Sequence, residues 1–279
     1  MSATSQSRAA ETDLLYLRDA YATDFTATVI GVRGGGVRGG GVPGGGVPGG
    51  GGSEDTPPAI ALDRTLFYAT GGGQPNDTGV LAGLPVVKVG KEGGPDGQLV
   101  WHTVSLDEGA NADTALPEVG AEVAGSIDWK RRHELMRTHT ALHILCGVIW
   151  NEWGVAVTGG NMEPLSARMD FEFDPLPEGF AGRITELVNA EIEADRPVEV
   201  SFLPRGEALA DEDLIRTKVN LIPEFVTEIR VVDIVGLDKQ ADGGTHVAST
   251  KEVGRFAVTK TESKGKGNKR VRIALSSLD

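Results

Sequence analysis

Residues 129–153 form the segment that most limits the possible folds, because helical patterning runs through them without a proline. Apolar residues recur at helical spacing: Leu135, Leu142, Leu145, Ile149 and Trp153. Asp128 precedes the segment as a candidate N-cap, and Gly154 follows it as a stop. The pattern predicts one long helix, around which a folded domain has to pack.

The chain before this helix has a different character. Short apolar or alternating segments cover residues 14–32, 59–70, 80–90, 98–104 and 121–129, separated by Gly, Pro, Asn and Asp. Several short strands with turn signals predict a small β-barrel that ends near residue 125. The Gly-rich repeat at 34–53 cannot bury a core, and we expect a disordered insertion between two strands.

Strands and helices mix after the long helix. Alternating patterns predict strands at 167–174, 197–204, 228–238, 254–263 and 269–275. Helices are expected at 178–196 and 207–217. The fold class is therefore α+β, with an N-terminal β-barrel domain at 1–125 and a second α+β domain at 126–279.

The composition of the chain bears on the cellular compartment of the protein. The 279 residues include one cysteine, Cys146, so an intrachain disulfide is impossible. The N-terminus has no apolar region typical of a signal peptide, and no apolar run is long enough to span a bilayer. We expect a monomer in a reducing cytoplasm, with no membrane partner.

The charge distribution bears on nucleic-acid partners. A formal net charge of −13 argues against non-specific binding to phosphates. Two basic clusters stand out locally, and each by itself is more typical of a solvated face. The first comprises Lys130, Arg131, Arg132 and Arg137, and the second Lys264, Lys266, Lys269, Arg270 and Arg272.

Two histidines lie four residues apart in the predicted helix. His139 and His143 share one helical face, a spacing that suits two ligands of a transition metal. A zincin-type protease needs Glu directly after the first His, and Thr140 stands there instead. The alternative is two partly buried histidines with ordinary hydrogen bonds.

A second pair follows at Asp242 and His246. The two glycines between them let the backbone turn sharply, so that a carboxylate and an imidazole can converge beyond a predicted strand. The alternative is a simple turn with a surface histidine. Taken together, the two pairs predict a single metal site between the helix and this loop.

The motifs together resemble the AlaX family, free-standing relatives of the editing domain of alanyl-tRNA synthetase. The resemblance rests on HTALH, the later GGTH, FYATGGGQPNDTG before them and SKGKGNKRVRI after them. It covers the chain from about residue 14 to its end, apart from the Gly-rich insertion. The second additional domain of threonyl-tRNA synthetase shares the two metal-binding pairs.

The resemblance implies an activity and a cofactor. Members hydrolyse the ester that joins serine or glycine to alanine tRNA, and one Zn²⁺ would be held by His139, His143, residue 242 and His246. The family usually has Cys at this position, whereas this chain has Asp242. Aspartate is a harder zinc ligand, so another divalent metal is an alternative, although three histidines favour zinc. We expect Cys146 in the core rather than at the metal.

Further site residues follow from the resemblance. The metal-dependent deacylase would recognise its substrate through Thr158 and Asn161, for which a Gly-rich turn is the alternative interpretation. The other candidates for substrate binding are Gly72, Gly73, Gln74 and Thr245. Lys264, Lys266, Lys269 and Arg270 are the candidates for binding the tRNA partner. The sequence identifies no catalytic residue.

Two other functions remain open. One is hydrolysis of a different aminoacyl-tRNA or acyl ester on the same scaffold. The other is a non-catalytic, metal-stabilised tRNA-binding module in which Asp242 marks a lost activity. An intact synthetase is not expected, because the chain carries no signature for ATP binding or amino-acid activation.

Overall fold

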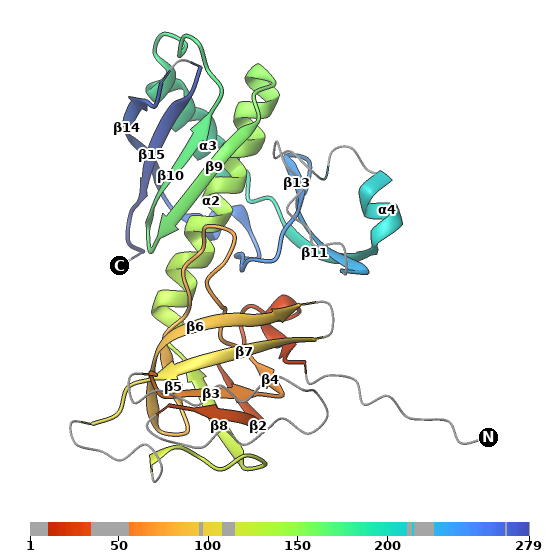
Figure 1. Cartoon of the computed structure of the whole chain (residues 1–279). Helices are drawn as coiled ribbons and strands as arrows, with labels where there is room; N and C mark the ends of the chain where they lie inside the picture. Colours follow the sequence, from red (N-terminus) through yellow and green to blue (C-terminus); the bar gives the residue numbers. More distant parts are fainter. Residues whose placement is uncertain are drawn as a thin grey trace. The chain divides into compact units, whose positions relative to one another are not determined.

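The computed structural model in Figure 1 describes residues 11–34, 56–94, 97–107, 115–210, 214, 226–265 and 267–278. Most of the predicted Gly-rich insertion lies outside these residues. The chain divides into two compact units. Met1–Thr70 and Asn76–Trp129 form the first, and Gly71–Pro75 and Lys130–Asp279 form the second. The mixed α+β class is confirmed, whereas the domain boundary after residue 125 stays a prediction.

Six antiparallel strands of the first unit close on themselves in the order β2-β3-β7-β6-β5-β8. Their bounds are β2 Asp24–Arg33, β3 Ala59–Leu62, β5 Gly79–Leu81, β6 Leu84–Gly94, β7 Gly97–Val104 and β8 Glu122–Ile127. A short parallel pair joins β1 (Asp13–Leu14) to β4 (Arg64–Thr65), with the 3₁₀ turn η1 (Leu15–Leu17) between them in sequence. The strand predicted from residue 14 therefore begins only at Asp24.

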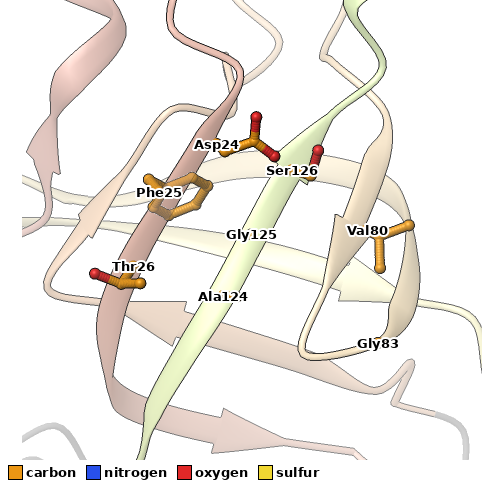
Figure 2. A pocket seen from close by; sticks show the side chains of 8 residues that line it. All are labelled: Asp24, Phe25, Thr26, Val80, Gly83, Ala124, Gly125 and Ser126. Atoms are coloured by element: carbon orange, nitrogen blue, oxygen red, sulfur yellow. The ribbon is translucent and has the colours of Figure 1, made fainter.

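Alternation along these strands fills the barrel. Ala27, Val29, Val89, Val100 and Val123 all belong to the buried core. The neighbouring positions of β2 and β8 are exposed or half-buried. A pocket lies where β2, β8 and β5 meet (Figure 2). Its lining residues are Asp24, Phe25, Thr26, Val80, Gly83, Ala124, Gly125 and Ser126. This pocket includes none of the residues that the sequence marks as candidate site residues.

Gly125 of β8 is required by a close approach. It pairs with Phe25 of β2, and an added Cβ would lie 2.4 Å from the Phe25 ring. That ring contacts Phe67 edge-on, with 5.9 Å between the centroids. The glycine thus leaves room for an aromatic side chain that helps to fill the barrel.

The second unit is built around α2 (Trp129–Trp153), which has the bounds predicted for the long helix. One sheet has the order β14-β15-β10-β9, with β9 Val157–Glu163, β10 Ser166–Phe171, β14 Phe256–Ser263 and β15 Lys269–Leu275. The other has the order β11-β12-β13, with β11 Val198–Pro204, β12 Glu228–Ile234 and β13 Asp238–Ala241. The remaining elements are α3 (Phe180–Glu193), α4 (Arg205–Ala210) and η3 (Thr250–Val253).

Helix α2 is buried on nearly every side, which the sequence did not predict. Arg132 and Arg137 are fully or almost fully buried, so the expected solvated basic face at 130–137 is wrong for these two residues. Arg137 donates from Nε and Nη2 to the carbonyl of Val253, at 3.1 and 2.9 Å, and from Nη2 to that of Ser276 at 2.6 Å. The guanidinium satisfies carbonyl groups beyond the helix, and this offsets its desolvation.

The other predicted elements of this unit are present, and most of them are shorter than predicted. The predicted helix at 178–196 is α3, and the strand at 269–275 is β15. The short helix expected at 207–217 is described only to Ala210, as α4, and most of the rest lies outside the described residues. Of the helices that the structure describes, none combines the length and apolar character needed to cross a bilayer.

A histidine buried inside the barrel makes the first unit sensitive to acid. His102 of β7 is fully buried, with Nδ1 3.0 Å from the carbonyl of Ile60 and Nε2 2.8 Å from the Thr65 hydroxyl. A carbonyl only accepts, so Nδ1 carries the proton and Nε2 accepts. Burial lowers the pKa of His102 to about 4, although the bond to Ile60 opposes this shift.

We predict that His102→Gln reduces the loss of stability in acid. The folded-state pKa lies below the unfolded value near 6.5, so this stability is present above pH 6.5 and is lost as the pH falls towards 4. Between pH 7 and pH 5 the wild type should lose about 2 kcal/mol more free energy of unfolding than the variant. Urea unfolding of both proteins at both pH values measures this, since other groups titrate alike in each. Equal losses would contradict the prediction.

Candidate metal centre

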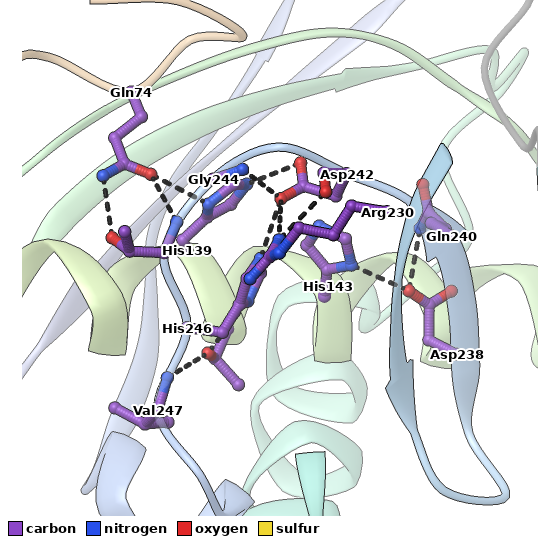
Figure 3. A network of polar contacts seen from close by, with 12 residues as sticks. Gln74, His139, His143, Arg230, Asp238, Gln240, Asp242, Gly244, His246 and Val247 are labelled. Atoms are coloured by element: carbon purple, nitrogen blue, oxygen red, sulfur yellow. Dashed lines mark hydrogen bonds and ion pairs between the residues drawn. The ribbon is translucent and has the colours of Figure 1, made fainter. Parts of the chain in front are cut away.

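Four side chains from two distant segments converge in the second unit (Figure 3). His139, His143, Asp242 and His246 each offer one ligand atom, and these atoms lie within 4.8 Å of one another. The Asp242 carboxylate lies 3.1 Å from His246 Nε2 and 3.6 Å from His139 Nε2. Two ligands about 2.1 Å from a tetrahedral ion stand roughly 3.4 Å apart, so these separations fit one metal ion.

Helix α2 supplies the first pair of imidazoles. His139 and His143 lie one turn apart, and their ring centroids are 5.1 Å apart in an edge-on arrangement. The ring of His246 stacks on His139 at 4.3 Å. The separations of the four ligand atoms confirm the prediction that the two pairs meet in space. All three histidines are buried, so the alternative of a surface His246 is wrong.

The loop after β13 supplies the second pair. The Gly244 N–H donates to Asp242 Oδ2 at 2.6 Å, which folds the loop back on the carboxylate. Arg230 of β12 donates from Nη1 to the Asp242 carbonyl at 2.9 Å, and this nitrogen lies 3.8 Å from Oδ2. The carboxylate is thus oriented by a backbone donor and by a guanidinium.

Gly244 is needed for the loop to approach α2. An added Cβ would lie 2.3 Å from Cε1 of His139 and 2.8 Å from Oε1 of Gln74. Gly243, by contrast, has nothing within 4 Å of such an atom and is exposed. Of the two glycines in the motif, the second therefore makes the convergence possible.

Burial and neighbouring charges set the protonation of the cluster. Burial lowers the pKa of His139 to about 4, aided by His143 and Arg230 and opposed by the charge of Asp242. Burial and the charge of His139 hold the pKa of His246 well below its usual range. Both rings are neutral near pH 7, the form that binds a metal.

Neighbouring groups together shift the pKa values of His143 and Asp242 more than burial does. Burial would lower the pKa of His143, but the hydrogen bond and charge of Asp238 raise it above its usual value. Burial would raise the pKa of Asp242, but the nearby histidines, His139 first, hold it well below its usual value. Asp242 is therefore a carboxylate at neutral pH.

Gln74 enters this site from the glycine turn. Gly71 and Gln74 exchange backbone hydrogen bonds of 3.1 and 2.9 Å around Gly72 and Gly73, which have φ of 57° and 84°. These are the left-handed angles of a two-residue turn, which favour glycine. Gly73 accepts a 3.1 Å hydrogen bond from the Met162 N–H of β9. The tight turn predicted here is confirmed.

The other candidates for substrate binding, Thr245, Thr158 and Asn161, differ in their exposure to solvent. Thr245 is fully buried, with its hydroxyl 2.9 Å from Gln74 Nε2. Thr158 and Asn161 are exposed and belong to β9, so the alternative of a Gly-rich turn is wrong. Pairing with β10 holds these residues extended despite the two intervening glycines. The Thr158 hydroxyl donates to the Asp170 carbonyl at 3.1 Å.

Of the candidate tRNA-binding residues, Lys264, Lys269 and Arg270 lie on the β14–β15 hairpin. Arg270 makes a bidentate pair with Asp170, with both bonds at 2.7 Å. Lys269 lies 3.2 Å from the Ser263 hydroxyl, Lys264 is exposed, and Lys266 lies outside the described residues. The Arg270 guanidinium is thus already engaged by a carboxylate.

Two residues near the centre were not predicted from the sequence. Arg230 is a charged residue between two buried apolar neighbours in β12, and Asp238 follows buried Leu237 at the start of β13; both charged residues are buried. Such a charge needs a buried partner, and that was the available signal. Cys146 is buried in α2 and does not belong to the four-residue cluster found among the described residues, so its expected core location is confirmed.

Comparisons with known proteins agree on one family. Residues 229–272 match the model of the threonyl and alanyl tRNA synthetase second additional domain. The alanyl-tRNA editing protein AlaX-M of Saccharolobus solfataricus is 34% identical, over 93% of this chain and 97% of its own length. That of Methanosarcina acetivorans is 32% identical, over 95% of this chain and 99% of its own. This chain belongs to the AlaX family.

Synthetases are also among the relatives of this AlaX chain. The alanine–tRNA ligase of Pyrobaculum neutrophilum is 37% identical over 73% of the chain, which corresponds to 22% of the ligase. The similarity is thus to one part of a much longer protein. The coverage of AlaX-M, in contrast, is nearly complete on both sides.

Gly244→Ala and Gly243→Ala test the close approach of the loop. Gly244→Ala should displace His139 or the loop, lower the free energy of unfolding by about 1–3 kcal/mol and reduce any metal content of the purified protein. Gly243→Ala should change stability by about 0.5 kcal/mol at most and leave the metal content unchanged. Chemical unfolding and elemental analysis measure both. Equal behaviour of the two variants would show that the loop does not depend on this contact.

Proposed function

We propose that this chain is a trans-editing hydrolase that removes serine, and as a second substrate glycine, from mischarged alanine tRNA. The observation that carries this proposal is the match to alanyl-tRNA editing proteins along nearly the whole length of both chains. The buried cluster of three histidines and a carboxylate supports it, because it offers a cofactor site suited to ester hydrolysis. We propose residues 126–279 as the editing domain.

His139, His143, Asp242 and His246 would hold one Zn²⁺ per chain. The donors fit, because two of the rings have pKa values lowered by burial and the carboxylate has one held low by its neighbours. A bound zinc ion would polarise the ester or hold the substrate amine. Other divalent metals are a second possibility, since carboxylate replaces the softer thiolate common in the family.

Thr158 and Asn161 are proposed to recognise the side chain of the misacylated amino acid. Both are exposed on β9, the strand onto which the glycine turn is hydrogen bonded through Gly73 and Met162. A site that bonds the serine hydroxyl disfavours alanine, since alanine would leave the polar partner unsatisfied. Gly72 and Gly73 are proposed to line the same region with backbone groups, with Gln74 and Thr245 behind them.

We propose that the tRNA partner contacts Lys264, Lys266, Lys269 and Arg270. Exposed Lys264 supports the proposal most directly, because its charge lies at the surface. Arg270 would have to exchange or share Asp170 to reach a phosphate, so we expect a smaller contribution from it. Phosphate contacts position the substrate and do not choose the amino acid.

Deacylation assays test the proposed activity. The purified protein should release serine from Ser-tRNA(Ala), release glycine more slowly and leave Ala-tRNA(Ala) intact. Chelation, or Asp242→Ala, should abolish the release of serine and reduce bound zinc, because a ligand is lost. Release of radiolabelled amino acid and elemental analysis measure these outcomes. Tight tRNA binding without hydrolysis of any substrate would instead support the non-catalytic module, and hydrolysis of other esters alone would support the alternative hydrolase.

Thr158→Val and Asn161→Ala test recognition of the serine hydroxyl. At least one of them should lower kcat/KM for Ser-tRNA(Ala) by about tenfold to a hundredfold and leave Gly-tRNA(Ala) nearly unaffected, since glycine lacks the hydroxyl. Thr26→Val, at an exposed threonine of β2 in the first unit, is the matched control and should change neither rate. Equal losses for both substrates would exclude a role in selecting serine.

A further inference from the structure

Each of the three clustered imidazoles has its Nδ1 atom next to a different partner (Figure 3). His139 Nδ1 lies 3.1 Å from Gln74 Oε1, and His143 Nδ1 lies 3.0 Å from Asp238 Oδ2. His246 Nδ1 lies 3.1 Å from the Thr140 hydroxyl. The Nε2 atoms of His139 and His246 lie beside the Asp242 carboxylate, so these two rings are held at Nδ1 from the side away from that carboxylate.

The proton on His139 can be assigned from the neighbours of Gln74. The Thr245 backbone N–H lies 3.2 Å from Gln74 Oε1, and a backbone N–H can only donate. The Gln74 amide nitrogen in turn donates to the Thr245 hydroxyl at 2.9 Å. Gln74 Oε1 is therefore an acceptor, so His139 must donate from Nδ1 and keep the Nε2 lone pair for the cluster.

Asp238 assigns the proton on His143 in the same way. Its side chain is fully buried, and Oδ2 accepts from His143 Nδ1 and from the Gln240 amide at 2.8 Å. A carboxylate oxygen accepts from both, so Nδ1 of His143 is the donor. The Gln240 bond fixes the carboxylate, which lies at the start of β13, ahead of the loop that carries Asp242.

We propose that Gln74 and Asp238 are positioning residues of the metal centre, holding His139 and His143 with Nδ1 protonated, so that the Nε2 lone pairs would be free to bind a metal ion. The inference rests on the proposed function and deepens it. Gln74 does more than contact one ring, because it also bonds Thr245 in the loop between Asp242 and His246. It therefore joins the glycine turn, α2 and the ligand loop at one buried amide. Partners that orient a ligand in this way contribute to metal affinity.

Zinc affinity in four variants tests the proposal. Gln74→Met and Asp238→Ala remove the acceptors and should weaken Zn²⁺ binding by about tenfold to a hundredfold. Gln74→Glu and Asp238→Asn keep an acceptor oxygen and should lose less. Competition with a chromogenic chelator measures the affinity of the full-length protein, and circular dichroism confirms that each variant is folded.

The visible spectrum of the Co²⁺-loaded protein supplies a second readout. This spectrum responds to the orientation of the ligands. It should change in Gln74→Met and Asp238→Ala, but not in a variant whose substitution lies far from the cluster. Asn189→Ala is that control, because among the described residues its amide bonds backbone groups of Thr185 in α3 and of Phe256, away from the cluster. It should lower the melting temperature while leaving the Zn²⁺ affinity and the Co²⁺ spectrum unchanged.

Three results would overturn the proposal, and they separate it from the proposed function. Folded Gln74→Met and Asp238→Ala that bind Zn²⁺ within twofold of the wild type, in a protein that edits Ser-tRNA(Ala), would refute this inference alone. An equal loss of affinity in Asn189→Ala would assign the effect to general stability and refute it too. A wild type that neither binds Zn²⁺ nor edits would refute the proposed function together with the inference.

Discussion

Helix α2 is enclosed by the rest of its unit, and its buried polar side chains determine much of what surrounds it. Arg137 is bonded to carbonyls of two later segments, and the Thr138 hydroxyl accepts from the Leu165 N–H at 2.9 Å. Thr140 accepts from the Val247 N–H at 3.2 Å next to its contact with His246. An unpaired buried polar group is costly, so the elements that complete these bonds are held in place. His139 and His143 belong to the same enclosed surface.

The loop with Asp242 is adapted to this surface by backbone geometry and by charge. Gly244 leaves room for the His139 ring, and its N–H binds the Asp242 carboxylate. Arg230 adds a buried positive charge beside the same residue. One oxygen of the Asp242 carboxylate, Oδ2, contacts the Gly244 N–H and lies 3.8 Å from Arg230 Nη1, and the other, Oδ1, lies 3.6 Å from His139 Nε2. Aspartate therefore fits this position in the loop and also offers an oxygen that could bind a metal.

Local patterns predicted much of the fold because they report on single elements. The bounds of α2 and β15 follow from their periodicity, and the turn at Gly72 and Gly73 follows from the backbone angles that glycine permits. The same reasoning failed where a neighbour decides the outcome. Residues 158–161 are rich in glycine and look like a turn, yet pairing with β10 makes them a strand. Arg137 looks like a surface residue until its carbonyl partners are known.

The sequence by itself determined the family, the long helix and the four side chains of the centre, because these depend on residue type and spacing. The tertiary structure alone decided what surrounds those side chains. Gln74 lies 65 positions from His139, and Asp238 lies 95 from His143, separations over which periodicity carries no information. Their roles arise from hydrogen bonds that form only once the glycine turn, α2 and β13 are packed together. That packing turns two weak sequence motifs into one cluster of side chains that could hold a metal ion.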